Sequence, residues 1–218
     1  MSKLVFSVPY YDSAFEAGCV IDREEGRFEM RVQAAGEVVM TSGELIGADP
    51  LILVGMAPFV QTVPVGSFPV QLAVAKIDGD ERVALARIDF STDAIVMWEM
   101  ALLPEQDPDA LEEDEIYGYT TDAGMACFMD AASADALKSE ISNDSDFFEE
   151  LMEEMDENFQ PTWSWANMEL ETGNIVSFMS GYGNGYYATY LGRNAAGEVV
   201  AVVTDFEVIP WHGTSYQA

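Results

Sequence analysis

The chain carries three aspartates whose residue type suits the binding of a hard metal ion. Asp122, Asp130 and Asp205 each stand beside a stretch of β-forming residues, and carboxylate oxygens are the ligands that Mg²⁺ and Ca²⁺ prefer. If the fold brought the three together, they could support a metal-dependent hydrolase without a histidine ligand. Aspartates at strand ends also form turns and caps, and this is the interpretation that we expect to hold.

A second possible chemistry, besides a metal site, is catalysis by a nucleophilic side chain that is activated by a base. A cysteine nucleophile needs a base, and the one histidine of the sequence is His212, close to the C-terminus. Cys127 stands between Ala126 and Phe128 in an apolar stretch, so we expect a buried and unreactive thiol. The GxSxG pattern of serine hydrolases does not occur. A pair of carboxylates could hydrolyse a glycoside, but a chain with so many acidic residues contains such pairs by chance. We therefore expect no catalytic residue and no cofactor.

The glycine-rich stretch "SGYGNGYYATYLG", residues 180–192, suits either a phosphate-binding loop or the tip of a hairpin. A phosphate-binding loop leads into the N-terminus of a helix, whereas β-forming tyrosines and a threonine follow Gly185. Asn184–Gly185 favours a type I′ turn, and Gly181 and Gly183 would permit a bulge or a close approach of backbone. The stretch therefore predicts a hairpin tip.

The charge of the chain restricts the partners that it can bind. The sequence has 39 acidic and 9 basic residues and a formal net charge of −30. Such a field repels nucleic acids and anionic membranes and attracts a basic protein, for instance a toxin. Adaptation to a salty habitat would explain the same composition.

The sequence also predicts where the protein resides. No apolar stretch approaches the roughly 18 residues that span a bilayer, and the first residues lack the pattern of a secretory signal peptide. Two cysteines, Cys19 and Cys127, are too few for a disulfide scaffold or a four-ligand zinc site. We expect a cytoplasmic protein with reduced thiols.

Residues 105–157 hold the highest concentration of acids, and part of this segment predicts an amphipathic helix. Asp146 and Glu149 have the spacing of a capping box at its start. Five apolar residues recur at helical spacing: Phe147, Phe148, Leu151, Met152 and Met155. The opposite face carries Glu149, Glu150, Glu153, Glu154 and Glu157. A solvated helix face is the ordinary interpretation, and the functional one is a binding surface for a basic partner.

Most other segments predict β-structure. Alternating apolar residues in 68–90, around the turn sequence "DGDE" at 78–81, give the clearest hairpin. Residues 26–40 predict two short strands around a turn at 34–36. Residues 174–205 predict a three-stranded meander that includes the glycine-rich tip.

These elements define the expected fold class. Residues 131–141 have a helix-forming composition, so two helices are expected within about 131–157. The remainder predicts an α+β fold that is mainly antiparallel β, with hairpins and meanders in a sandwich-like arrangement. Because no flexible linker interrupts the sequence, we expect a single domain over 1–218, with a tail at 207–218.

Several stretches occur in a specific order: "PVGSFPVQLAVA", "RVALARIDFS", "WEMAL", "DEIYGYTTDAGMACFMD", "NIVSFMSGYGNGYYATYLG" and "GEVVAVVTDF". Together they resemble a bacterial family known as domain of unknown function 4241, over about residues 50–206. The family has no established activity, so the resemblance implies no reaction. It marks eight positions: Asp122, Gly124, Cys127, Asp130, Gly181, Gly185, Tyr187 and Asp205.

Two classes of function remain open. The first is a non-catalytic binding protein, an inhibitor or immunity protein whose acidic surface engages a basic toxin; by analogy, similar acidic proteins are often encoded near secreted toxins. The second is a small hydrolase that uses a metal at Asp122, Asp130 and Asp205.

Overall fold

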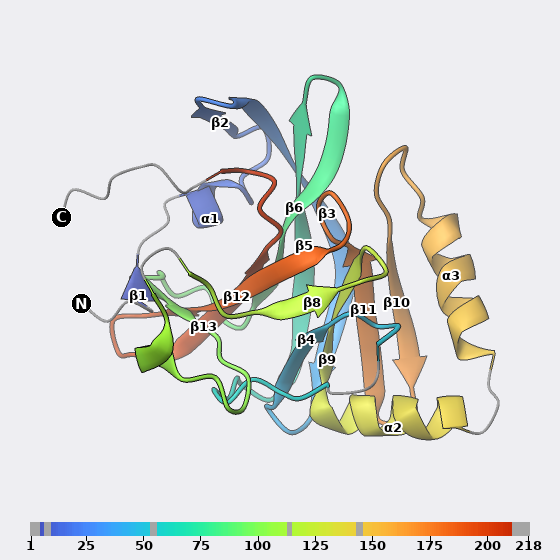
Figure 1. Ribbon diagram of the computed structural model, residues 1–218. Coiled ribbons are helices and arrows are strands. Elements are labelled where there is room, and N and C mark those ends of the chain that lie inside the picture. Colours follow the sequence, from blue (N-terminus) through green and yellow to red (C-terminus); the bar gives the residue numbers. More distant parts are fainter. Residues whose placement is uncertain (1–4, 7–9, 53–55, 113–114, 143–145, 211–218) are drawn as a thin grey trace.

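The computed structural model describes residues 5–6, 10–52, 56–112, 115–142 and 146–210. They form a large antiparallel sheet, a small antiparallel sheet packed against it, and helices on the outer face of the small sheet (Figure 1). This arrangement confirms the predicted α+β fold with mainly antiparallel strands. None of the helices found in the described segments combines the length and the apolar character that crossing a bilayer demands.

The large sheet contains nine strands among the described residues. In spatial order they are β1 (Val5–Phe6), β7 (Met97–Met100), β12 (Gly185–Arg193), β13 (Val199–Asp205), β6 (Asp80–Asp89), β5 (Gly66–Ile77), β3 (Gly26–Met40) and β2 (Val20–Arg23), with β8 (Tyr119–Thr121) paired to β12. The hairpin of β5 and β6 is confirmed. Its turn residues Asp78 and Gly79 have φ angles of 51° and 88°, and a type I′ turn requires positive φ at both positions.

The small sheet supplies residues to two cores. Its strand order is β10 (Trp165–Leu170), β11 (Gly173–Met179), β9 (Met125–Asp130) and β4 (Leu45–Ala48). Successive side chains of a strand point to opposite faces. Ala126 and Phe128 of β9 therefore join the core between the sheets, whereas Cys127 and Met129 join the core under the helices.

The two predicted helices are present as α2 (Ala131–Ser142) and α3 (Phe147–Glu157), and two shorter ones, α1 (Tyr10–Ser13) and the 3₁₀-helix η1 (Pro108–Ala110), were not predicted. The apolar stripe of α3 is buried at Phe147, Leu151 and Met155, which fixes the orientation of the helix. Asp146 is the N-cap residue, but its side chain makes no capping hydrogen bond. The predicted capping box is therefore wrong, and packing of the stripe holds the helix in place.

Residues 26–40 form one strand, not the two that were predicted. Between the pairs Ala34–Gln71 and Glu37–Pro69 the register shifts, so two residues of β3 oppose one of β5, as in a β-bulge. Gly36 lies in the bulge with a φ of 91°. A bulge also accommodates Pro69, which has no N–H to donate to a neighbouring strand.

The predicted meander over residues 174–205 is correct only in its second half. The hairpin of β12 and β13 forms as expected. β11, however, pairs with β9 and β10, whereas β12 pairs with β7, β8 and β13. The connection from β11 to β12 therefore carries the chain from the small sheet to the large one.

Candidate functional site

Asp205, the last residue of β13, holds the N-terminal helix α1 against the large sheet. The hydroxyls of Tyr10 and Tyr11 donate hydrogen bonds of 3.0 and 2.8 Å to its Oδ2 atom, and the Glu207 N–H donates one of 2.9 Å to Oδ1. Burial raises the pKa of this carboxyl to about 6, although the hydrogen bonds act in the opposite direction. The carboxylate thus joins segments from the two ends of the described chain.

Asp130 ends β9 and has no exposed surface. Its Oδ2 accepts hydrogen bonds from the Ser42 N–H (2.9 Å), the Ser42 hydroxyl (2.8 Å) and the Thr41 N–H (3.1 Å). Its Oδ1 accepts from the Thr41 hydroxyl and the Ala132 N–H, both at 3.0 Å. Burial alone would raise the pKa of this carboxyl, but the hydrogen bonds outweigh it and the pKa is lowered. Asp130 therefore fixes the turn after β3 and the start of α2.

The hypothesis of an aspartate cluster is not supported by the fold. Asp122 lies in the loop between β8 and β9, Asp130 belongs to the small sheet and Asp205 to the large one. In the part of the chain that the structure describes, no three His, Cys, Asp or Glu side chains are grouped so that they could hold a metal ion. The alternative that these aspartates meet as metal ligands therefore has no support in the described residues, where Asp130 and Asp205 end strands of different sheets.

Sequence reasoning missed Asp49, a buried carboxylate that connects two loops beside a pocket. Its Oδ2 accepts hydrogen bonds of 2.8 Å from the backbone N–H groups of Asp122 and Ala123, and its Oδ1 accepts one of 2.9 Å from Leu51. The signal that could have found it is the dipeptide Asp49–Pro50, because aspartates in turns accept the N–H two residues further on.

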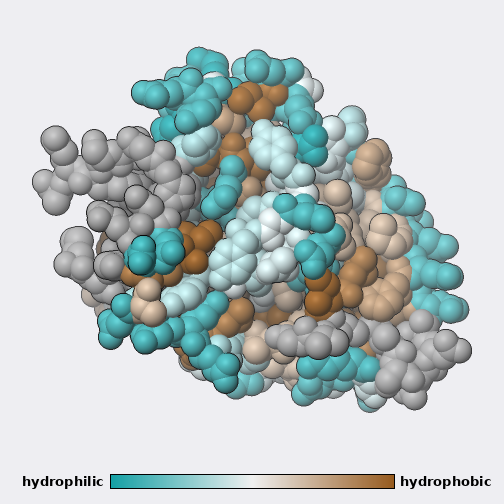
Figure 2. All heavy atoms as spheres, in the orientation of Figure 1, coloured by the Kyte–Doolittle hydropathy of each residue, from teal (hydrophilic) through white to brown (hydrophobic). Residues whose placement is uncertain are grey.

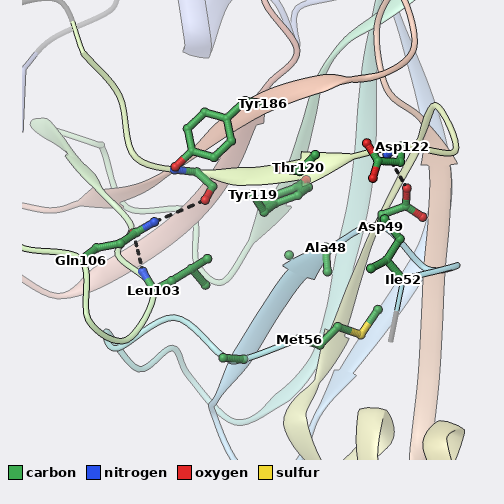
Figure 3. A pocket seen from close by; sticks show the side chains of 13 residues that line it. Ala48, Asp49, Ile52, Met56, Leu103, Gln106, Tyr119, Thr120, Asp122 and Tyr186 are labelled. Carbon is green, nitrogen blue, oxygen red and sulfur yellow. Dashed lines mark hydrogen bonds between the residues drawn. The ribbon is translucent and has the colours of Figure 1, made fainter. Parts of the chain in front are cut away.

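The pocket beside Asp49 has a volume of about 470 Å³ and lies between strands β4 and β8 (Figure 3). Asp49 and Asp122 lie at one end of it, and Gln106 and Tyr186 lie at the other. These residues come from three segments of the chain, around residues 49, 106–122 and 186, which the approach of β4 and β8 brings together.

The glycine-rich turn differs from the predicted type I′ geometry. Gly181 and Gly183 have φ angles of 51° and 116°, and the Gly183 N–H donates a 2.7 Å hydrogen bond to the Ser180 carbonyl. Asn184 and Gly185 do not have the positive φ angles that were expected. The prediction was wrong because it assumed that the flanking strands pair with each other.

Four of the positions marked by the resemblance meet at this turn. The Tyr187 hydroxyl donates a 2.9 Å hydrogen bond to the Gly183 carbonyl. A Cβ atom on Gly181 would lie 2.8 Å from the backbone oxygen that follows β13, and one on Gly185 would lie 2.5 Å from the Tyr187 ring. A Cβ atom on Gly124 would lie 3.4 Å from the Gly183 Cα. The glycines therefore permit close packing of the crossing between the sheets.

Cys127 is completely buried beneath the helices, as expected. Burial raises the pKa of its thiol far above the ordinary value, and a thiol that stays protonated is a poor nucleophile. His212, the one possible imidazole base, lies outside the described residues.

The outer face of α3 is acidic and exposed to solvent (Figure 2, right-hand edge). Four of the five predicted glutamates are exposed: Glu149, Glu150, Glu153 and Glu157. Glu154 is half-buried, and its Oε1 accepts a 3.3 Å hydrogen bond from the Asn158 side chain. Met152, which was predicted to belong to the apolar stripe, is 43% exposed, and Phe159 just beyond the helix is 59% exposed.

Most basic side chains of the described residues pair with carboxylates outside α3. The ion pairs are Arg27–Asp22, Arg31–Glu81, Arg82–Asp80, Arg87–Asp12, Arg87–Asp89, Lys138–Asp135 and Arg193–Glu99. Within the described segments, none of these pairs involves a glutamate of α3. The charge of the α3 face is therefore not neutralised by any ion pair with the part of the chain that the structure describes.

Comparison with known proteins gives the chain a family. No curated protein and no solved structure matches it. The sequence model of the family described as "Protein of unknown function (DUF4241)" matches residues 38–204, which cover most of the chain and include the glycine-rich turn, the pocket and α3. The chain therefore belongs to the DUF4241 family.

Proposed function

We propose that this protein is a non-catalytic binding protein, an inhibitor of the immunity-protein type, that engages a basic partner protein through the outer face of α3. The observation that carries the proposal is the row of exposed glutamates on α3, which forms no ion pair with the described chain. The net charge of −30 has the same sign, so the field at this face attracts a basic protein and repels nucleic acids and anionic membranes.

Two exposed apolar side chains, on α3 and just beyond its end, could contribute apolar area to such an interface. Met152 lies one helical turn from Glu149, and Phe159 follows the end of the helix. Protein interfaces combine a buried apolar core with a polar rim. Burial of Met152 and Phe159 would stabilise the complex, whereas the glutamates would mainly accelerate association.

The proposal includes neither a cofactor nor a catalytic residue. It places the protein in the cytoplasm, where the free cysteines Cys19 and Cys127 would stay reduced. An unpaired, buried thiol such as Cys127 is compatible with that compartment.

The test begins with affinity capture from the native host, followed by association kinetics with the purified partner. One variant replaces Glu149, Glu150 and Glu153 with lysine. A matched control replaces Glu16, Glu24 and Glu25 with lysine. These three glutamates are exposed and lie outside α3, so both variants change the net charge by the same amount.

We expect a partner of basic isoelectric point. The α3 variant should slow association about five- to tenfold and weaken its salt dependence, and the control should stay within about twofold of the parent. Equal slowing by both variants would show that overall charge, and not α3, guides binding. Capture of no stoichiometric partner, combined with turnover of a phosphoester or glycoside by the pure protein with Mg²⁺, would reject the proposal.

A further inference from the structure

The pocket beside Asp49 lies where the edges of two sheets approach each other. β4 is the outer strand of the small sheet, and β8 pairs with β12 alone among the described strands. The pocket volume of about 470 Å³ falls in the range of small-ligand sites, roughly 300–1,000 Å³. The cleft is therefore large enough to bind a small organic group.

One end of the pocket is acidic and has no basic counterpart. Asp49 accepts three backbone N–H groups, two of them from the loop that carries Asp122. The Asp122 side chain is exposed and, within the described chain, forms no hydrogen bond or ion pair. The described residues that line the pocket include no lysine, arginine or histidine. Two carboxylates thus lie at this end with no cation among the described lining residues; hydrogen bonds fix the one of Asp49, and the one of Asp122 is exposed and free to bind a ligand.

The opposite end offers neutral hydrogen-bonding groups that the protein itself holds in place. The Gln106 Oε1 accepts a 2.7 Å hydrogen bond from the Leu103 N–H, and its Nε2 donates one of 3.4 Å to the Gly118 carbonyl. The Tyr186 hydroxyl accepts a 2.8 Å hydrogen bond from the Gly118 N–H. A hydroxyl that accepts in this way still has its own proton to donate.

Apolar side chains line the part between these ends. The ring of Tyr119 lies between the two ends, Met56 lies below it, and Ile52 lies beside Asp49 (Figure 3). Small-ligand sites typically combine such apolar walls with a few fixed polar groups. The lining therefore suits a ligand with a positively charged head and a short apolar stem.

We infer that this pocket binds an organic cation, a guanidinium or ammonium group on a short apolar stem, with the cation held at Asp49 and Asp122. Guanidinium N–H groups form charge-assisted hydrogen bonds with carboxylates. A divalent metal fits less well, because it takes six or more oxygen ligands and Asp49 already accepts three N–H groups. This inference goes beyond the proposed function of α3 and is tested without a partner protein.

The decisive comparison uses two probes of nearly the same shape, n-butylguanidinium and its neutral analogue n-butylurea. Each is titrated into the ¹⁵N-labelled full chain at low salt and followed by amide chemical shifts. We expect n-butylguanidinium to shift the Asp122, Ala123 and Gly118 amides with a Kd on the order of 1 mM. n-Butylurea should bind about tenfold more weakly, because it lacks the charge.

A pair of variants locates the cation. Asp122→Asn removes the exposed carboxylate while keeping its size, and we expect it to weaken n-butylguanidinium binding about fivefold or more. Asp135→Asn on α2 makes the same change of charge at an exposed position and should leave the Kd within about twofold. Because both positions are exposed, both variants should retain the amide spectrum of the folded parent.

Three outcomes would overturn the inference: equal binding of the two probes, shifts confined to α3, or equal weakening by the two variants. A further titration separates the two sources of such a cation. Tighter binding of an acetylated and amidated Gly-Arg-Gly peptide than of n-butylguanidinium would identify a protein side chain as the ligand. Binding of n-butylguanidinium alone would identify a free small molecule.

Discussion

Asp130 and Asp205 are both buried at the ends of strands, yet their surroundings shift their pKa values in opposite directions. Asp130 accepts five hydrogen bonds, from three backbone N–H groups and two hydroxyls. Asp205 accepts three, from two tyrosines and one N–H. The pKa of Asp130 is lowered, whereas that of Asp205 is raised to about 6. The balance between burial and hydrogen-bond donors therefore decides the direction of each pKa shift: the donors outweigh burial at Asp130, and burial outweighs the donors at Asp205.

The opposite shifts give the two aspartates opposite effects on stability. A lowered pKa in the folded state means that ionised Asp130 stabilises the fold, and this contribution is lost as the pH falls below the ordinary value of 3.8. A raised pKa means that ionised Asp205 opposes folding, so its unfavourable effect grows as the pH rises from about 4 to about 6. The two effects fall in different pH ranges and can be measured separately.

Replacing Asp130, the carboxylate that accepts five hydrogen bonds, should have the largest effect on stability. Asp130→Asn places an amide group among five donors, so at least two or three of them lose an acceptor in a buried site. We expect the free energy of unfolding to fall by about 3 kcal/mol or more at pH 7, measured by urea denaturation. The control Asp135→Asn, five residues further along the chain and exposed, should change it by less than about 0.5 kcal/mol. A loss below about 1 kcal/mol for Asp130→Asn would remove the distinction between the two sites.

The effect of the matched substitution Asp205→Asn on the free energy of unfolding should depend on pH. Asparagine resembles the neutral acid, so Asp205→Asn removes a group whose pKa rises from 3.8 to about 6 on folding. Relative to the variant, the parent should lose about 2 kcal/mol of stability between pH 4 and pH 6, out of about 3 kcal/mol over the whole titration. Urea denaturation of both proteins at half-unit pH steps measures this difference. If the difference stayed constant across that range, the pKa of Asp205 would not be raised.

Removing one hydrogen-bond donor from Asp205 should widen the difference between the pKa values of Asp130 and Asp205. Tyr11→Phe deletes the shorter of the two tyrosine hydrogen bonds, 2.8 Å against 3.0 Å for Tyr10. We expect the free energy of unfolding to fall by about 1.5–2 kcal/mol at pH 7. We also expect a further rise in the pKa of Asp205, so that the loss of stability with rising pH extends to higher pH values. Tyr10→Phe should have the same effects to a smaller degree. A larger effect of Tyr10→Phe would contradict this order of the two donors.

Local patterns predicted the elements of the fold better than their partners. The apolar spacing of 147–155 was sufficient for α3, and Asp78–Gly79 for the β5–β6 hairpin, because periodicity and turn geometry act over a few residues. Asn184–Gly185 carries the same turn signal, but the strands beside it belong to different sheets. The choice of strand partner depends on burial of the whole core, which a short stretch of sequence does not contain.

The acidic face of α3 and the pocket show the same limit for candidate sites. Exposure of Glu149 and Glu153 followed from helical spacing alone, since both lie opposite the buried stripe. The pocket joins Asp49, Gln106 and Tyr186 from three distant segments, and no spacing in the sequence relates them. The alternative of an aspartate cluster shows the converse, because Asp130 and Asp205 both follow β-forming stretches in the sequence but lie in different sheets.

The smallest predicted effect tests whether the donors of Asp130 act together. Ser42→Ala removes one hydroxyl donor at 2.8 Å and leaves the other four in place. Since residue 42 is exposed, water can replace the lost hydroxyl, and we expect a loss of about 0.5–1 kcal/mol by urea denaturation. Ser42→Thr keeps the hydroxyl and should restore the stability of the parent. A loss above about 2 kcal/mol for Ser42→Ala would mean that a single donor dominates, and the number of donors would then no longer explain why Asp130 and Asp205 differ.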